Sequence, residues 1–213
     1  MVTVQDKFKS FNENAIDASF FTNHDTARAA GYFNYDEDKI KMAAGMNLMM
    51  AGNSFIYYGE ELGMSGSGRD ENKRAPMYWS TTEQTGMTIG PQEMETVTHN
   101  FGTYEDQVND PMSIYNYYKR AVRLRNENPE IARGTTKVMD TLNQGEIAAI
   151  TRTYEDSSIA IVYNISEEEV QVKLSDTDMN IEAIRGYLST NGAAVTLKGD
   201  VLTMPPYSIV VLK

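Results

Sequence analysis

In the stretch Ala18-Ser19-Phe20-Phe21-Thr22-Asn23-His24-Asp25, a mainly apolar run ends in three polar residues. A second run of the same kind, Ser54-Phe55-Ile56-Tyr57-Tyr58, ends at Gly59-Glu60-Glu61. Between them, Asp36-Glu37-Asp38 opens a segment whose apolar residues recur every three or four positions, namely Ile40, Ala43, Ala44, Met46 and Met50. The short runs predict buried strands, and the spacing between them predicts a helix with an acidic first turn. A strand, a helix and a strand in this order form a βαβ unit with parallel strands.

The remainder of the chain changes character near Gly134. Residues 3–10 read as the end of a helix, and a loop-like segment runs from Gly59 to about Asn109. Asp110-Pro111 predicts the next helix, with Asp as N-cap and Pro in its first turn, ending at Pro129 and Gly134. After that come strand-like runs at 135–141, 146–154, 158–164, 168–174, 182–189, 194–197 and 201–212, the last long enough for two strands. These runs predict an antiparallel β-sandwich, so we expect two domains, residues 1–134 and 135–213.

The composition excludes several classes of protein. The 19 Lys and Arg residues against 30 Asp and Glu residues give a net charge of −11, which argues against a nucleic-acid partner. The sequence contains no cysteine and two histidines, so thiolate chemistry is excluded and a histidine zinc site is almost excluded. No apolar run reaches the roughly 18 residues of a membrane span, and the first residues lack the pattern of a signal peptide.

Polar side chains follow both predicted strands and are the candidate functional residues. Residues at the carboxyl ends of parallel strands line the active sites of β/α proteins. His24 beside Asp25 can bind hydroxyl groups and stabilise developing positive charge, although a capping Asp and a packed His explain the pair equally simply. For Glu60 and Glu61 we favour structural roles over catalysis, one packed inside and one bound to a backbone N–H.

Apolar and aromatic side chains allow two interpretations. The methionines at positions 42, 46, 49 and 50 share a helix and are expected in the core. The aromatic residues Tyr57, Tyr58, Tyr78 and Trp79 either stack on sugars or, more often, pack with the polar tip hydrogen-bonded.

These motifs resemble glycoside hydrolase family 13, the α-amylase family. Residues 20–25 are similar to its motif at the end of barrel strand seven, and residues 52–61 to its strand-eight motif, with Ser54 where the family usually has Pro. Residues 69–79, Arg69-Asp70-Glu71-Asn72-Lys73-Arg74-Ala75-Pro76-Met77-Tyr78-Trp79, resemble the loop that follows. Residues 110–125 resemble the eighth helix. The resemblance implies an α/β plus all-β fold: a partial (β/α)8 barrel (strands 7 and 8 with their helices), followed by an antiparallel β-sandwich.

The resemblance also implies roles for four residues. Asp25 is similar to the family carboxylate that holds hydroxyls at the cleaved bond and stabilises the oxocarbenium-like transition state. His24 resembles the hydroxyl-binding histidine, and Asn23 belongs to the same substrate-binding motif. Arg28 lies where many relatives have an arginine near the substrate.

Retaining glycosidases need a nucleophile and an acid/base about 5–5.5 Å apart, and this family carries them on strands four and five. We therefore expect a C-terminal fragment of a retaining α-amylase that acts on starch and maltooligosaccharides and is inactive alone. An oligo-1,6-glucosidase or related α-glucosidase, a non-catalytic glucan-binding module and a structural module stay open. We expect no cofactor or metal in this chain, calcium only in the full-length parent, and an extracellular or cell-surface parent.

Two strands cannot close a barrel, so unpaired edges and an apolar face remain. The partners expected are an α-glucan and the missing N-terminal half of the barrel. We expect the isolated chain either to self-associate through the exposed face or to have a poorly ordered strand-seven region.

Overall fold

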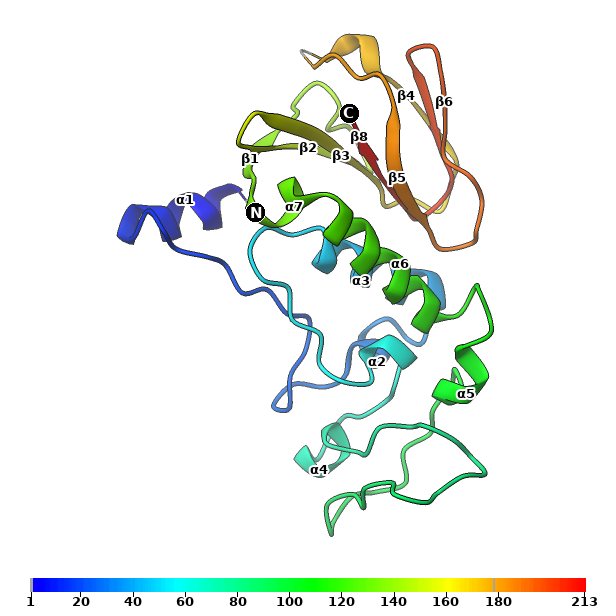
Figure 1. Ribbon diagram of the computed structural model, residues 1–213. Coiled ribbons are helices and arrows are strands. Elements are labelled where there is room, and N and C mark those ends of the chain that lie inside the picture. Colours follow the sequence, from blue (N-terminus) through cyan, green and yellow to red (C-terminus); the bar gives the residue numbers. More distant parts are fainter. Residues whose placement is uncertain (1, 178) are drawn as a thin grey trace.

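The computed structural model describes residues 2–177 and 179–213, in which a helical part precedes antiparallel sheets (Figure 1). This order confirms the predicted fold class. The helices are α1 (Val2–Phe11), α2 (Ala29–Tyr32), α3 (Glu37–Leu48), α4 (Asp70–Lys73), α5 (Tyr104–Gln107), α6 (Ile114–Glu127) and α7 (Pro129–Arg133), with a 3₁₀ helix η1 (Glu60–Leu62). No helix in the part that the structure describes is both long and apolar enough to cross a membrane.

The two apolar runs lie side by side and parallel, as predicted, but they do not form regular strands. Phe20 and Phe55 make a single parallel bridge, and the Phe55 N–H donates to the Ser19 carbonyl at 2.7 Å. The predicted strand lengths are therefore wrong. Strands of a parallel sheet are normally paired and covered on both sides. Here each run has one neighbour among the described residues, and Phe20 and Phe55 are 53% and 57% exposed.

The helix between the two runs, α3, begins as the sequence predicts. The Asp36 side chain caps it by accepting from the Lys39 N–H at 3.1 Å, and Glu37 and Asp38 lie in its first turn. The next long helix, α6, begins later than predicted. Ser113, not Asp110, is its N-cap and accepts from the Asn116 N–H at 3.2 Å.

Asp110 instead caps a tight turn, in which its Oδ1 accepts from the Met112 N–H at 2.8 Å. Pro129 occupies the first turn of the separate helix α7. N–H groups in a first turn have no partner within the helix, so the missing N–H of proline costs no hydrogen bond there.

The sheets match the predicted strands closely. β1 (Thr135–Val138), β2 (Ile147–Tyr154), β3 (Ser157–Asn164), β8 (Ser208–Leu212) and β5 (Ile184–Ser189) form one antiparallel sheet in that order. β4 (Val170–Lys173), β7 (Val201–Met204) and β6 (Thr196–Lys198) form the other. The last predicted run divides into two strands at Pro205 and Pro206, which cannot donate to a sheet ladder.

Alternate residues of β3 join two different cores. Ile159, Ile161 and Tyr163 pack with α3 and α6, whereas Ala160 and Val162 pack against the three-stranded sheet. This central strand is therefore buried on both faces. One face packs on the helical part and the other on the three-stranded sheet (Figure 1).

Two cationic side chains, the buried Lys41 and the half-buried Arg125, join α3 to the elements around it. The Lys41 ammonium donates to the carbonyls of Met112 at 2.5 Å and Thr190 at 3.3 Å. From α6, Arg125 donates to the carbonyls of Leu48 at 2.5 Å and Met50 at 2.6 Å. The bonds of Arg125 satisfy carbonyls at and just after the end of α3, where no helical N–H follows.

Candidate functional site

Asn23, His24 and Asp25, called the 23–25 turn below, follow the first apolar run directly. The Asn23 Oδ1 accepts from the N–H groups of Asp25 at 2.8 Å and Thr26 at 3.1 Å. An Asn side chain that bonds the backbone two residues later closes an Asx turn. Asn23 therefore shapes the turn, while the side chains of His24 and Asp25 are 59% and 65% exposed.

The Asp25 carboxylate presents its two oxygens differently. Its Oδ1 lies 3.3 Å from His24 Nε2 and 3.3 Å from Arg74 Nη2. Within residues 2–177 and 179–213, no hydrogen bond or ion pair reaches its Oδ2. A carboxylate has about four acceptor sites, so Oδ2 is available to donors such as sugar hydroxyls.

Two cations of the loop-like segment contact this turn. The Lys73 ammonium donates to the backbone carbonyl of Asp25 at 3.0 Å and to Asp70 Oδ1 at 2.9 Å. Arg74 lies 3.7 Å from Asp70 Oδ2 in addition to its contact with Asp25. The hydrogen bond and the charge of Lys73 hold the pKa of Asp70 below its ordinary value. The turn therefore has one exposed acid, a neighbouring histidine and two adjacent cations.

Arg28 lies beneath this surface rather than on it, with 1% of its area exposed. Its Nη1 donates to the Tyr58 carbonyl at 2.6 Å, and its guanidinium lies 4.8 Å from the ring centres of both Tyr57 and Tyr58. Its Nε and Nη2 are buried with no hydrogen-bond partner in the described part of the chain. Burial lowers the pKa of Arg28. Direct contact of Arg28 with substrate stays a prediction.

Two carboxylates at the start of η1 follow the second apolar run: Glu60 is buried and Glu61 is half-buried. The Thr22 hydroxyl donates to Glu60 Oε1, and burial raises the pKa of Glu60 to about 7. Burial also raises the pKa of Glu61, against the opposing effects of nearby backbone N–H groups and of Arg28. Glu61 Oε2 has no hydrogen-bond partner among the residues described. Glu60 thus has the packed position that we favoured from the sequence.

The aromatic residues are mostly engaged with the protein. The hydroxyls of Tyr57 and Tyr58 donate to the carbonyls of Lys73 at 3.2 Å and Ala75 at 2.8 Å. Tyr78 stacks on His99 with ring centres 4.3 Å apart, and Trp79 contacts Tyr104 edge to face at 5.6 Å. Trp79 keeps 48% of its area exposed, so a ligand can reach this ring.

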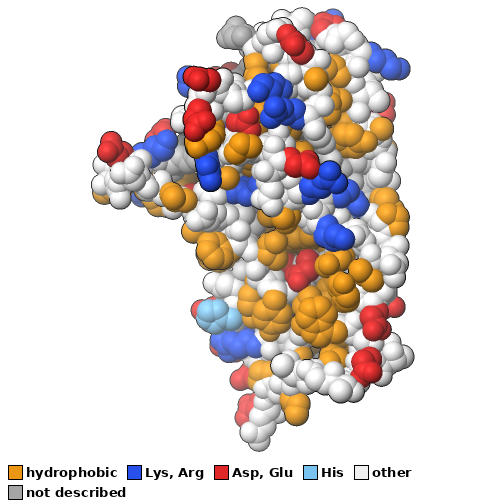
Figure 2. Space-filling view, in the orientation of Figure 1, with side chains coloured by type: hydrophobic (Ala, Val, Ile, Leu, Met, Phe, Trp, Pro, Cys, Tyr) orange, Lys and Arg blue, Asp and Glu red, His pale blue; other side chains and the backbone are white. Residues whose placement is uncertain are grey.

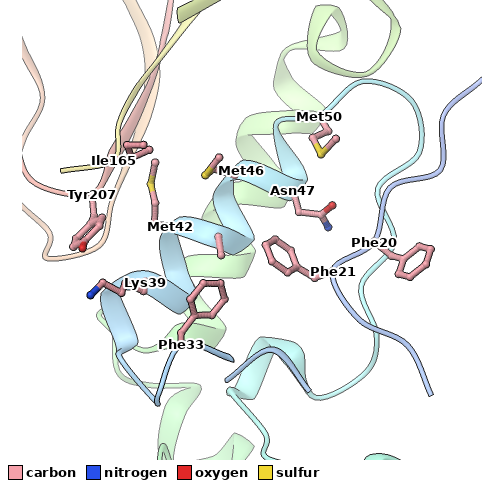
Figure 3. Close-up of a pocket in the computed structure, with 11 residues that line it drawn as sticks. Phe20, Phe21, Phe33, Lys39, Met42, Met46, Asn47, Met50, Ile165 and Tyr207 are labelled. Atoms are coloured by element: carbon pink, nitrogen blue, oxygen red, sulfur yellow. The ribbon is translucent and has the colours of Figure 1, made fainter. Parts of the chain in front are cut away.

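An apolar cavity of about 540 Å³ lies on the outer side of α3. Figure 3 shows Met42 and Met46 on the helix and Phe33 near its start, with Phe21 on one side and Tyr207 on the other. The expected burial of the methionines holds for Met42 and Met49, is only partial for Met50, and is wrong for Met46, which is 42% exposed. Elsewhere, hydrophobic side chains also gather on the face that Figure 2 presents.

Metal ligands do not gather in the part of the chain that the structure describes: it contains no group of three or more His, Asp or Glu side chains able to hold an ion.

Sequence reasoning located the 23–25 turn but missed Lys73 and Arg74 as its neighbours. Their charges were visible in the run of residues 69–79, yet the return of this loop to the turn is a tertiary contact. It also missed Thr22, whose buried bond to Glu60 links the two apolar runs.

Comparison with known proteins finds matches to both parts of the chain. Residues 1–134 match the alpha amylase catalytic domain, and residues 147–211 match the alpha-amylase SusG C-terminal domain. Alpha-amylase SusG of Bacteroides thetaiotaomicron is 31% identical over 93% of this chain and 30% of its own length. The structure of Eubacterium rectale Amy13B superposes with a TM-score of 0.94 at 41% identity, over 99% of this chain and 41% of that one.

An oligo-1,6-glucosidase of Parageobacillus thermoglucosidasius is 27% identical over 74% of this chain and 35% of its own length. The chain thus spans less than half the length of these relatives. The catalytic-domain match covers 134 of its 213 residues and includes the 23–25 turn. On this match the chain belongs to the α-amylase family, glycoside hydrolase family 13.

Proposed function

We propose that this chain is the C-terminal part of a retaining α-amylase that hydrolyses α-1,4 bonds in starch and maltooligosaccharides. The observation that carries the proposal is the Asp25 carboxylate, exposed at the end of the first apolar run with Oδ2 unengaged among the described residues. Because the chain belongs to the α-amylase family, we assign Asp25 a role in glycoside hydrolysis. The exposed carboxylate supplies the acceptor that the reaction requires.

Asp25 and His24 have complementary tasks in this proposal. Two hydroxyls of the sugar at the cleaved bond donate to Asp25, and His24 binds an adjacent hydroxyl. Positive charge then develops on the sugar ring in the transition state, and the nearby negative charge of Asp25 stabilises it. Asn23 contributes by fixing the turn through its bonds to Asp25 and Thr26.

The chain alone is proposed to be inactive, because retention needs a nucleophile and an acid/base about 5–5.5 Å apart. The carboxylates near Asp25 are otherwise engaged or buried. Asp70 is bound to Lys73, Glu60 is bound to Thr22, and Glu61 has a buried Oε2. We propose that the catalytic pair belongs to an N-terminal half of the barrel, which completes the site. We also propose an extracellular or cell-surface location for the whole protein.

Release of reducing sugar from soluble starch and maltoheptaose by the purified chain tests the assignment, with Asp25→Asn as the matched variant. We expect no release from either protein. Release that disappears in Asp25→Asn contradicts the proposal, because the chain would then contain a complete catalytic set.

The runner-up is an oligo-1,6-glucosidase parent, which the 27% identical relative supports. Comparing the affinities of the chain for maltoheptaose and isomaltotriose separates the two parents. Tighter binding of isomaltotriose favours the α-1,6 alternative. No affinity for either sugar at millimolar concentration favours a structural module instead.

A further inference from the structure

We propose that Lys73 is a positioning residue, which holds the 23–25 turn in place through the backbone carbonyl of Asp25. The inference rests on the proposed function, in which Asp25 must present its carboxylate to a sugar in a fixed direction. Lys73 lies outside the turn motif, 48 residues further along the chain.

The Lys73 side chain is mostly covered by the protein, and its ammonium makes two directed hydrogen bonds at the surface. Its side chain is 12% exposed, and the ammonium donates to the Asp25 carbonyl at 3.0 Å and to Asp70 Oδ1 at 2.9 Å. These two hydrogen bonds fix the position of the ammonium, because one partner is the turn itself and the other is the neighbouring Asp70. Lys73 holds the backbone of Asp25, whereas Arg74 contacts its carboxylate.

The backbone that carries Lys73 is itself anchored. The hydroxyls of Tyr57 and Tyr58, at the end of the second apolar run, donate to the carbonyls of Lys73 and Ala75. The buried Asn72 donates to the Ser67 carbonyl at 3.0 Å and accepts from the Glu95 N–H at 2.9 Å. The ammonium therefore extends from a fixed support rather than from a free loop.

These contacts form a closed series that begins at Arg28 and returns to Asp25. Arg28 lies over the rings of Tyr57 and Tyr58, Tyr57 bonds the Lys73 carbonyl, and Lys73 returns to Asp25. The series of contacts therefore begins and ends within residues 25–28. Asn23 shapes the turn internally, and Lys73 fixes it relative to the rest of the molecule.

The contact with Lys73 leaves the Oδ2 atom of the Asp25 carboxylate free to bind a sugar. Lys73 binds the carbonyl, and no bond reaches Oδ2 from any residue that the structure describes. A sugar hydroxyl can therefore bind Asp25 without displacing Lys73. Loss of the ammonium is expected to loosen the turn while leaving its chemical groups intact.

Backbone ¹⁵N relaxation of the 213-residue chain tests the inference in Lys73→Met, Lys73→Arg and Lys198→Met. Lys198 is an exposed lysine on β6 and serves as the matched control. In Lys73→Met, we expect the order parameters of the Asp25 and Thr26 amides to fall from about 0.85 towards 0.6, with those of β3 unchanged. Lys73→Arg should retain the order, because a guanidinium also donates to both partners.

Unchanged order at Asp25 and Thr26 in Lys73→Met overturns the inference, as does an equal loss in β3 or the same loss in Lys198→Met. If Lys73→Met does not fold, Asp70→Asn decides, because it weakens one of the two bonds of the ammonium at an exposed residue. It should lower the same two order parameters, and no change contradicts the inference. Relaxation is read without ligand. An absence of glucan binding would therefore refute the proposed function without changing the conclusion that Lys73 orders the turn.

Discussion

Thr22 and Glu60 are joined by a buried hydrogen bond, in which the Thr22 hydroxyl donates to Glu60 Oε1. The bond connects the residue before the 23–25 turn to the first residue of η1, and so joins the ends of the two apolar runs. A single backbone bridge, Phe20 to Phe55, pairs these runs in the described chain. This side-chain bond therefore contributes directly to the alignment of the site.

The buried Glu60 makes stability depend on pH. Burial raises its folded-state pKa from about 4.5 to about 7, so the folded state binds the proton more tightly than the unfolded state. Stability is therefore lost as pH rises between these values. From this group we expect a decrease in the free energy of unfolding of up to about 1.4 kcal/mol per pH unit, measured by urea unfolding at pH 5, 6 and 7.

Glu60→Gln should remove this decrease, and the exposed Glu146→Gln should retain it. A slope that is equal in Glu60→Gln and the parent chain would show that another group titrates in this window.

Arg28→Met should destabilise the chain. The substitution removes the bond to the Tyr58 carbonyl and the contacts with two aromatic rings. We expect a loss of about 2–3 kcal/mol in the free energy of unfolding, measured with urea. Arg123→Met, at an exposed position of α6, should change it by about 0.5 kcal/mol or less. Unchanged stability with a loss of glucan affinity would instead favour Arg28 as a direct substrate contact.

Self-association through the apolar cavity on α3 is the third prediction. Met46 and Phe20 line this cavity and are partly exposed. We expect concentration-dependent sedimentation of the parent chain. Because burying a Met side chain is worth about 1.5–3 kcal/mol, Met46→Lys should weaken the association at least about tenfold. Val138→Lys, on the exposed side of β1, is the control and should leave it unchanged. A monomer at all concentrations of the parent chain contradicts the prediction.

The sequence predicted the elements that local chemistry determines. Asp36 before an acidic turn predicts the start of α3. Short strand-like runs separated by turn residues predict β2 and β3. The start of α6 could not be predicted in the same way. Asp110-Pro111 and Ser113 both have the chemistry of a helix start; in the structure Ser113 caps α6, and Asp110 closes the turn before it.

The candidate site shows the same division. Asn23, His24 and Asp25 are adjacent in the sequence, so one motif reveals them together. Lys73 and Arg74 reach Asp25 only because α4 folds back over the turn, and no local pattern encodes that return. The burial of Arg28 likewise depends on Tyr57 and Tyr58, about thirty residues away.

The most direct test of the central claim is an NMR titration of the ¹⁵N-labelled chain and of Asp25→Asn with maltoheptaose. The sequence contains only His24 and His99, so the ring signals of the two histidines can be assigned with one variant. We expect saturable shifts of the His24 ring and the 23–25 amides in the parent chain, and an affinity at least about tenfold weaker in Asp25→Asn. Equal affinity in both proteins, or shifts confined to residues far from the turn, would contradict the assignment of Asp25 to glucan binding.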